Sequence, residues 1–80
     1  MDDVFDWNIA RDNMFRLRTK ACLKQAELGK ELGVTASCIC NYENGKVIPK
    51  IDFVEKFCNY FGIGIDDLYI KDLIKGVLNL

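Results

Sequence analysis

The stretch QAELGKELGVTASCICNYENG, residues 25–45, contains two helical patterns with a turn signal between them. In its first half, Leu28 and Leu32 stand four residues apart and therefore fall on one face of a helix. Gly33 follows, and glycine readily takes the left-handed backbone conformation that closes a helix C-terminus. The first half thus predicts a short helix that ends in a sharp turn.

The second half predicts another short helix that begins after Thr35, because threonine is a good N-cap. Ile39 and Tyr42 have the spacing of an inward face, and Gly45 marks the end of the helix. The more exposed positions are Ala36, Ser37, Cys40, Asn41 and Asn44. Two short helices joined by a tight turn form a helix-turn-helix, whose second helix is able to enter the major groove of DNA.

Around this motif, the order and spacing of residues resemble the Cro/repressor-type (XRE-like) helix-turn-helix family over about residues 13–69. The family run L-x-Q-x-E-L-A-x-x-L-G-V-[ST]-x-x-x-I-x-x-[YLW]-E-x-G is matched by Leu23, Gln25, Glu27, Leu28, Leu32, Gly33, Val34, Thr35, Ile39, Tyr42, Glu43 and Gly45. Further matches are Asn13-Met14, Leu17-Arg18, Ile48-Pro49, Phe61-Gly62-Ile63 and Asp66–Leu68. Two positions depart from the family pattern, because Lys24 replaces the usual serine or threonine cap and Gly29 replaces the usual alanine.

The resemblance implies an all-α fold, a compact five-helix lambda-repressor-like DNA-binding domain with the helix-turn-helix at its second and third helices. It also implies a sequence-specific, double-stranded DNA-binding transcriptional regulator of the repressor kind, with the recognition helix at about residues 36–43 in the major groove. The alternative is a protein-interaction module on the same fold, antitoxin-like or an adaptor, with weak DNA binding. Only a genuine DNA reader would prefer some duplex over random competitor.

The same resemblance assigns roles to positions within the motif. The residues expected to contact DNA bases are Ala36, Ser37, Cys38 and Asn41. The residues expected to contact phosphates are Gln25, Lys24, Asn44 and Lys46. Among the first set, only Asn41 is able to make a bidentate contact with adenine, and Cys38 has the alternative of pointing toward the domain.

Arg18 and Glu43 stand where the family commonly has an ion pair that joins the first and third helices. Both are therefore assigned mainly to architecture, with DNA contact as the alternative. If the pair is partly buried, removing one partner should cost about 3–5 kcal/mol, because the other charge is left without compensation.

The rest of the chain is expected to supply three more helices, and residues 1–80 are expected to form a single domain. The first helix should run from about residue 7 or 8 to residue 20, with Met14 and Leu17 inward and Arg11 and Arg16 outward. A fourth helix is expected over about residues 51–61, and a fifth begins near residue 66. Residues 70–80 continue an amphipathic helical pattern, which would either cover the core of their own chain or contact a second chain. A homodimer is expected, because such repressors usually read two half-sites.

The distribution of charge favours a nucleic-acid partner. The net charge is −1, but residues 16–50 carry seven basic and three acidic residues, whereas residues 1–15 and 51–80 are both net acidic. Positive charge therefore collects around the helix-turn-helix, as expected for a surface that binds phosphate. With no histidine, no cysteine beside an obvious base and no phosphate-cradling glycine loop, we expect no enzymatic activity, cofactor or small-molecule substrate.

The four cysteines, Cys22, Cys38, Cys40 and Cys58, are expected to be reduced thiols and not metal ligands. Cys38 and Cys40 stand two apart on a predicted helix, so their side chains diverge by about 200° and do not close on one ion. The N-terminus MDDVFDW is acidic, unlike a signal peptide, and no apolar run approaches the roughly 20 residues of a membrane span. These features predict a cytoplasmic protein with no membrane partner.

Overall fold

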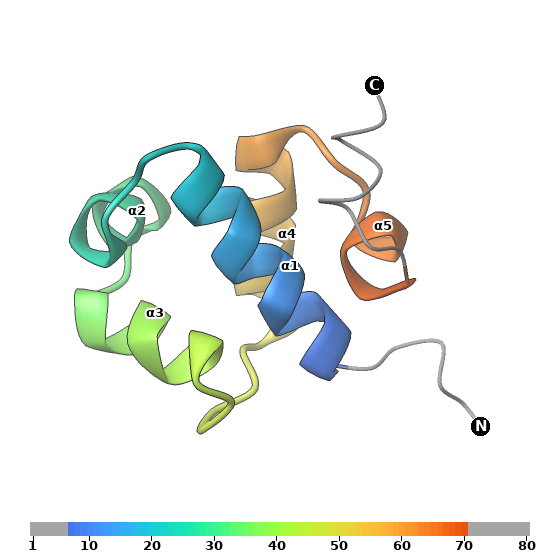
Figure 1. Cartoon of the computed structure of the whole chain (residues 1–80), viewed down its shortest axis with the longest axis horizontal. Helices are drawn as coiled ribbons and strands as arrows, with labels where there is room; N and C mark the ends of the chain where they lie inside the picture. The colour runs from blue at the N-terminus through green and yellow to red at the C-terminus, as the bar shows by residue number, and fades with distance from the viewer. Residues whose placement is uncertain (1–6, 71–80) are drawn as a thin grey trace.

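The computed structural model describes residues 7–70 of the 80-residue chain. Within that range the chain forms five helices and no strand: α1 (Trp7–Lys20), α2 (Gln25–Leu32), α3 (Ala36–Glu43), α4 (Ile51–Phe61) and α5 (Ile65–Ile70) (Figure 1). The all-α, five-helix prediction is confirmed, with the helix-turn-helix at α2 and α3. The predicted helical extension over residues 70–80 lies, apart from the last residue of α5, outside the described residues.

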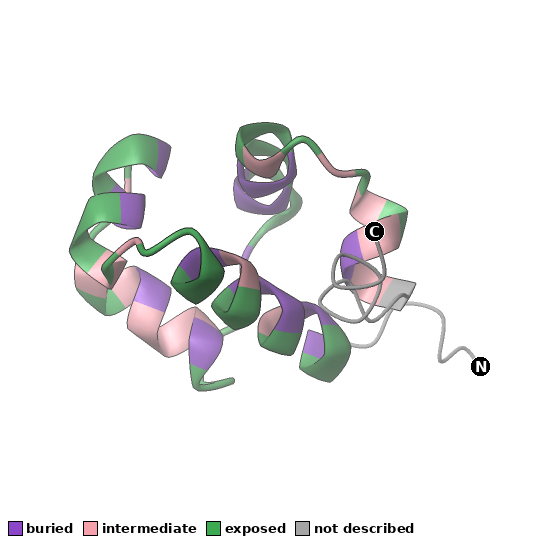
Figure 2. Cartoon of the chain, turned by 45° about the horizontal axis from the view of Figure 1, so that its top comes forward, coloured by how far each residue is buried: buried purple, intermediate pink, exposed green. Residues whose placement is uncertain are grey.

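The helices surround one shared core. In Figure 1, α1 crosses the middle of the molecule, α2 and α3 lie on one side of it, α5 on the other, and α4 behind. The buried faces of the helices turn toward this centre (Figure 2). Each helix contributes at least one fully buried side chain, namely Met14, Leu28, Ile39, Phe57 and Leu68. Because every helix adds apolar surface to the same core, the position of α3 depends on the packing of all the others.

Polar and aromatic contacts hold helix α5 against α1. The Asn13 side-chain amide donates a hydrogen bond of 2.8 Å to the backbone carbonyl of Leu68, and both residues are buried. Trp7 packs against Tyr69 with their ring centroids 6.0 Å apart. These contacts close the end of the molecule away from α2 and α3. No helix within residues 7–70 has the length and apolar character needed to cross a membrane.

Candidate nucleic-acid interface

The turn between α2 and α3 is built on two glycines. Gly33 adopts φ +78°, and the N–H of Val34 donates to the carbonyl of Gly29 at 2.8 Å, which closes the end of α2. A Cβ atom added to Gly29 would lie 2.5 Å from the carbonyl oxygen of Val34. The backbone of the turn therefore folds back onto α2 at the position where a side chain would stand. This contact explains why glycine is tolerated inside α2 despite its cost of about 1 kcal/mol in a helix interior.

Helix α3 begins and ends with side-chain and backbone caps. The hydroxyl oxygen of Thr35 accepts a hydrogen bond of 3.1 Å from the N–H of Cys38, as predicted for an N-cap. At the other end, Gly45 has φ +78°, and the N–H of Lys46 donates to the carbonyl of Asn41 at 3.0 Å. Both ends of the recognition helix are thus fixed before any ligand binds.

The carboxylate of Glu43 joins α3 to α1 and α2. Arg18 donates from Nε to Oε2 at 2.6 Å and from Nη2 to Oε1 at 2.9 Å, which is the two-pronged geometry that arginine makes with a carboxylate. The side chains of Arg18 and Glu43 are only 9% and 4% exposed. Arg18 also donates from Nη1 to the carbonyl of Leu23 at 2.7 Å. The predicted pair is therefore present, buried and fully hydrogen-bonded.

Gln25, the first residue of α2, donates from Nε2 to Oε1 of Glu43 at 3.0 Å. This bond fixes the amide at the end of α2 that exposes free backbone N–H groups. The preceding residue, Lys24, is exposed, and its own N–H donates to the Glu27 carboxylate at 2.7 Å. A lysine ammonium has no acceptor for the first N–H groups of the helix, so they remain available to an anion.

The outward side of α3 carries the residues predicted to read bases. Ser37 is exposed, whereas Ala36 and Asn41 are half-buried. Cys38 is half-buried as well, and its thiol donates to the hydroxyl of Tyr42 at 3.5 Å. The contact with Cys38 is the first cause and burial the second of a Tyr42 pKa that is raised above its ordinary value. In the structure the Cys38 thiol is thus engaged within α3, and both its base contact and the inward alternative stay predictions.

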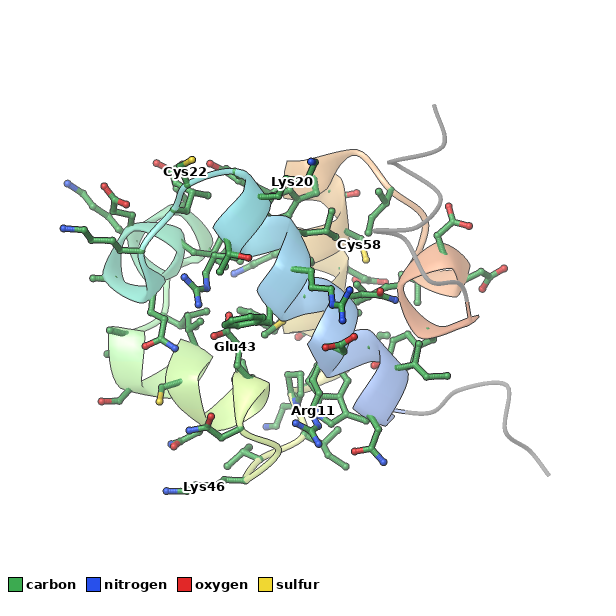
Figure 3. The ribbon with its side chains drawn as sticks, viewed as in Figure 1. Arg11, Lys20, Cys22, Glu43, Lys46 and Cys58 are labelled. Carbon is green, nitrogen blue, oxygen red and sulfur yellow. The ribbon has the colours of Figure 1, made fainter. Side chains whose placement is uncertain are left out.

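The prediction for the orientation of Arg11 on α1 is wrong. Arg11 was expected to point outward, but it is half-buried and donates from Nη1 to the backbone carbonyl of Glu43 at 3.3 Å. Its guanidinium also lies against Gly45, since a Cβ built on that glycine would be 3.2 Å from Nε of Arg11. Figure 3 shows Arg11 reaching from α1 toward the end of α3. A cation at the C-terminus of a helix is favourable, because the free carbonyls there carry partial negative charge.

The spacing of Arg11 and Arg18 on α1 contained a signal for this contact. Arg11 and Arg18 stand seven residues apart, which is about two helical turns, so they share a side of α1. Both reach Glu43, one through its backbone carbonyl and the other through its carboxylate. By contrast, Arg16 does lie outward and pairs with Asp12 at 3.1 Å. The helical period therefore places Arg11 and Arg18 on the side of α1 that faces Glu43, and Arg16 on the exposed side.

A family model described as helix-turn-helix matches residues 15–68. The chain belongs to the XRE-type helix-turn-helix family. Two archaeal relatives are similar to it. An uncharacterized HTH-type transcriptional regulator of Methanocaldococcus jannaschii is 38% identical over 50 residues, which cover 62% of this chain and 76% of the relative. One from Archaeoglobus fulgidus is 34% identical over 62 residues, which cover 78% and 89%.

Solved structures share the fold. The P22 c2 repressor, whose crystal structure contains the synthetic operator 9T, superimposes with a TM-score of 0.71 at 23% identity, covering 80% of this chain and 96% of that one. A transcriptional regulator from Listeria innocua gives a TM-score of 0.71 at 24% identity, covering 88% and 73%. The family model confirms the predicted family, and these structures confirm the predicted fold class.

In this XRE-type helix-turn-helix protein, the predicted phosphate contacts fall on two flanks of α3. Lys24 and Gln25 lie at the start of α2, whereas Asn44 and Lys46 follow the end of α3. Asn44 is exposed, and its amide donates to the Cys40 sulfur at 3.3 Å. Lys46 is exposed and projects from the edge of the molecule (Figure 3). The recognition helix is thus flanked on both sides by groups that suit phosphates, and these roles remain predictions.

The cysteines of this helix-turn-helix protein are free thiols with different surroundings. Cys22 is exposed, Cys38 and Cys40 are half-buried, and Cys58 is buried. Burial raises the pKa of the Cys58 thiol to about 11, and the negative charge of Asp67 adds to the shift. Cys58 is therefore a protonated core residue near neutral pH.

Proposed function

We propose that this chain is a sequence-specific, double-stranded DNA-binding transcriptional regulator that places α3 in the major groove. The proposal rests on the observation that α3 is capped at both ends and held in a fixed orientation, together with membership of the XRE-type family. The Glu43 carboxylate ties α3 to Arg18 and Gln25, so its outward face is held in one orientation. A rigidly held helix loses little conformational entropy when it binds.

Base reading in this proposal rests mainly on Ser37 and Asn41. Within residues 7–70, neither side chain makes a hydrogen bond, so both are available to a base edge. Asn41 is able to bind adenine through two hydrogen bonds, and Ala36 is able to meet a thymine methyl group. Cys38 keeps its predicted base contact only if its thiol leaves Tyr42.

Phosphate binding rests on the two flanks of α3. Lys46 and Asn44 would contact one strand beyond the end of α3, while Lys24, Gln25 and the free N–H groups of α2 would contact the other side of the groove. These contacts position the domain but read no sequence. The proposal also includes a homodimer, because two copies would double the number of bases read.

The proposal is tested by selecting duplexes from a random library and measuring their binding in gel shifts at several salt concentrations. Asn41→Ala should weaken the selected duplex about 10- to 100-fold while leaving random duplex nearly unchanged, because one bidentate base contact is lost. Lys46→Ala should weaken both duplexes alike and reduce the slope of log affinity against log salt by about 0.9.

Arg16→Ala is the matched control, since it removes an exposed cation already paired with Asp12. It should change neither the preference nor the slope. Selection that yields no preferred duplex, with no binding above random competitor at low salt, would refute the proposal and favour a protein-interaction module on the same fold.

A further inference from the structure

The indole N–H of Trp7 is a buried donor at the start of α1. Trp7 is only 9% exposed, and its Nε1 atom is shielded from solvent. Within residues 7–70, no group accepts a hydrogen bond from Nε1. Buried tryptophan N–H groups usually have an acceptor, because a buried donor without one costs free energy. The acceptor is therefore expected from outside residues 7–70.

Trp7 lies where the chain leaves α5. Its ring packs against that of Tyr69 with the centroids 6.0 Å apart, and Tyr69 is the penultimate residue of α5. The hydrogen bond of 2.8 Å from Asn13 to the Leu68 carbonyl fixes this part of α5 against α1, on one side of the molecule (Figure 1). Residues 71–80 therefore begin two positions beyond a side chain that contacts Trp7. Ten residues reach about 15 Å as a helix and about 33 Å when extended, which is enough to cover an indole ring.

The α5 side of this surface is apolar and half-buried. Ile65 and Tyr69 both pack against the core, yet part of each side chain stays uncovered. Figure 2 shows half-buried residues along α5. A segment that covers this surface must therefore bring apolar side chains together with an acceptor for the Trp7 N–H.

The sequence of residues 71–80, KDLIKGVLNL, meets both requirements. Its large aliphatic residues are Leu73, Ile74, Val77, Leu78 and Leu80. In a helix that continues α5, Leu73 would stand four residues after Tyr69, on the face toward Trp7. Gly76 is suited to end such a helix, and the carbonyls of the turn before it would have no partner within the helix. One of these carbonyls would be able to accept from the indole N–H.

Two other occupants fit this surface less well. Residues 1–6, MDDVFD, also adjoin Trp7, but three of them are aspartates, and a carboxylate loses favourable hydration beside an apolar surface. The same segment of a second copy would compete with a tethered one. A segment attached two residues away has an effective concentration on the order of millimolar, which favours the contact within one chain.

We infer that residues 71–80 fold over the Trp7–Tyr69 surface of their own chain and supply the acceptor for the Trp7 indole. The inference goes beyond the proposed function and does not depend on it, since the contact involves no DNA. It makes residues 71–80 part of the cover of the core and removes them from the candidates for a dimer contact. The amphipathic sequence pattern alone is compatible with both roles.

The fluorescence of the full chain tests this contact, because Trp7 is its only tryptophan. In the wild type, the emission should be blue-shifted and weakly quenched by acrylamide. Leu73→Asn should red-shift the emission and raise the quenching constant at least about twofold, because the ring loses its apolar cover. In proton–nitrogen NMR spectra, the single indole N–H should exchange with solvent at least about tenfold faster in the variant.

Lys75→Asn is the matched control, since it places the same amide in the same segment at a charged position. It should change the quenching constant less than about 1.5-fold. Circular dichroism should show both variants helical, because neither alters residues 7–70. If Leu73→Asn does not fold, Leu73→Ala makes a milder change and should move both signals in the same direction. Dilution of the wild type roughly a thousandfold should leave quenching unchanged, because a contact within one chain does not depend on concentration.

Three results would overturn the inference. One is a folded Leu73→Asn protein with wild-type quenching and exchange. Another is a wild-type emission that shifts to the red on dilution, which would assign the cover to a second copy. The third is a Phe5→Asn protein that exposes Trp7 while the two Leu73 variants do not, which would assign the cover to residues 1–6. Loss of duplex preference in the wild type would refute the proposed function and leave these signals unchanged.

Discussion

Glu43 is the residue on which three helices meet. Its carboxylate accepts hydrogen bonds from Arg18 of α1 and Gln25 of α2, and its backbone carbonyl accepts one from Arg11. All these donors act on the last residue of the recognition helix. This buried charge therefore adds to core packing in holding α3 against α1 and α2, provided that its partners stay in place.

Arg18→Ala should lower the free energy of unfolding by about 3–5 kcal/mol, because Glu43 would remain charged and buried without its main partner. Urea unfolding followed by circular dichroism gives this difference. Arg16→Ala is the control and should cost less than about 1 kcal/mol, since its pair with Asp12 is exposed. An Arg18→Ala protein that unfolds at the wild-type midpoint but no longer binds DNA would show that Arg18 serves DNA contact instead of architecture.

At the scale of the helices, the N-cap position of α2 is occupied by Lys24, a residue that suits phosphate binding but not helix capping. Most N-caps supply a side-chain oxygen to the first N–H groups, but Lys24 has none to offer. Glu27 completes only the return half of a capping box, by accepting from the Lys24 N–H at 2.7 Å. Lys24 thus leaves α2 without a side-chain N-cap, but it places a cation at the start of the helix, where it is predicted to face phosphate.

Lys24→Ser should therefore separate stability from DNA binding. A serine hydroxyl would complete the capping box with Glu27 and raise the free energy of unfolding by about 0.5–1 kcal/mol. Loss of the cation should weaken binding to all duplexes and reduce the salt slope by about 0.9.

Thermal melts and gel shifts measure the two effects of Lys24→Ser. Lys30→Ser, on an exposed interior position of the same helix, removes a charge without creating a cap and should not stabilise the protein. Lower stability together with unchanged DNA affinity in Lys24→Ser would contradict both halves of the prediction.

At the scale of the whole molecule, the stability of the shared core depends on pH through the buried thiol of Cys58. Cys58 is 2% exposed, and burial raises its pKa to about 11 from an ordinary value of 9.0. The folded state therefore holds the thiol proton more tightly than the unfolded state does. This contribution to stability is complete below about pH 9 and is lost as the pH rises toward 11.

Urea unfolding of wild type and Cys58→Ala between pH 8 and about 11 tests this linkage. The free energy of unfolding of the wild type should fall more steeply with pH than that of the variant, because only the wild type has the buried thiol. Tyr69, whose pKa is raised by burial and then by Cys58, is present in both proteins, so the part of its shift due to burial is common to both and only the part due to Cys58 is lost in the variant. Two parallel curves would show that Cys58 does not titrate with unfolding.

Much of this protein could be predicted from its sequence, because the relevant information is local. Gly33, Thr35 and Gly45 mark helix ends through backbone conformation and capping, which depend on only a few neighbouring residues. The structure begins and ends α3 where these residues predicted. The Arg18–Glu43 pair was also predicted, but only through resemblance to a family, since the residues lie 25 positions apart.

The tertiary structure decided the features that depend on contacts between distant parts of the chain. Arg11 turns from solvent to the Glu43 carbonyl, 32 residues away, because folding brings the end of α3 beside α1. The exposure of Val47, Ile48 and Ile51 is likewise visible only in the fold, since helical or loop periodicity does not say which apolar residues the core leaves uncovered. Local backbone preferences thus determined where the helices lie along the chain. Long-range packing decided which side chains hold α3 and which apolar side chains stay exposed.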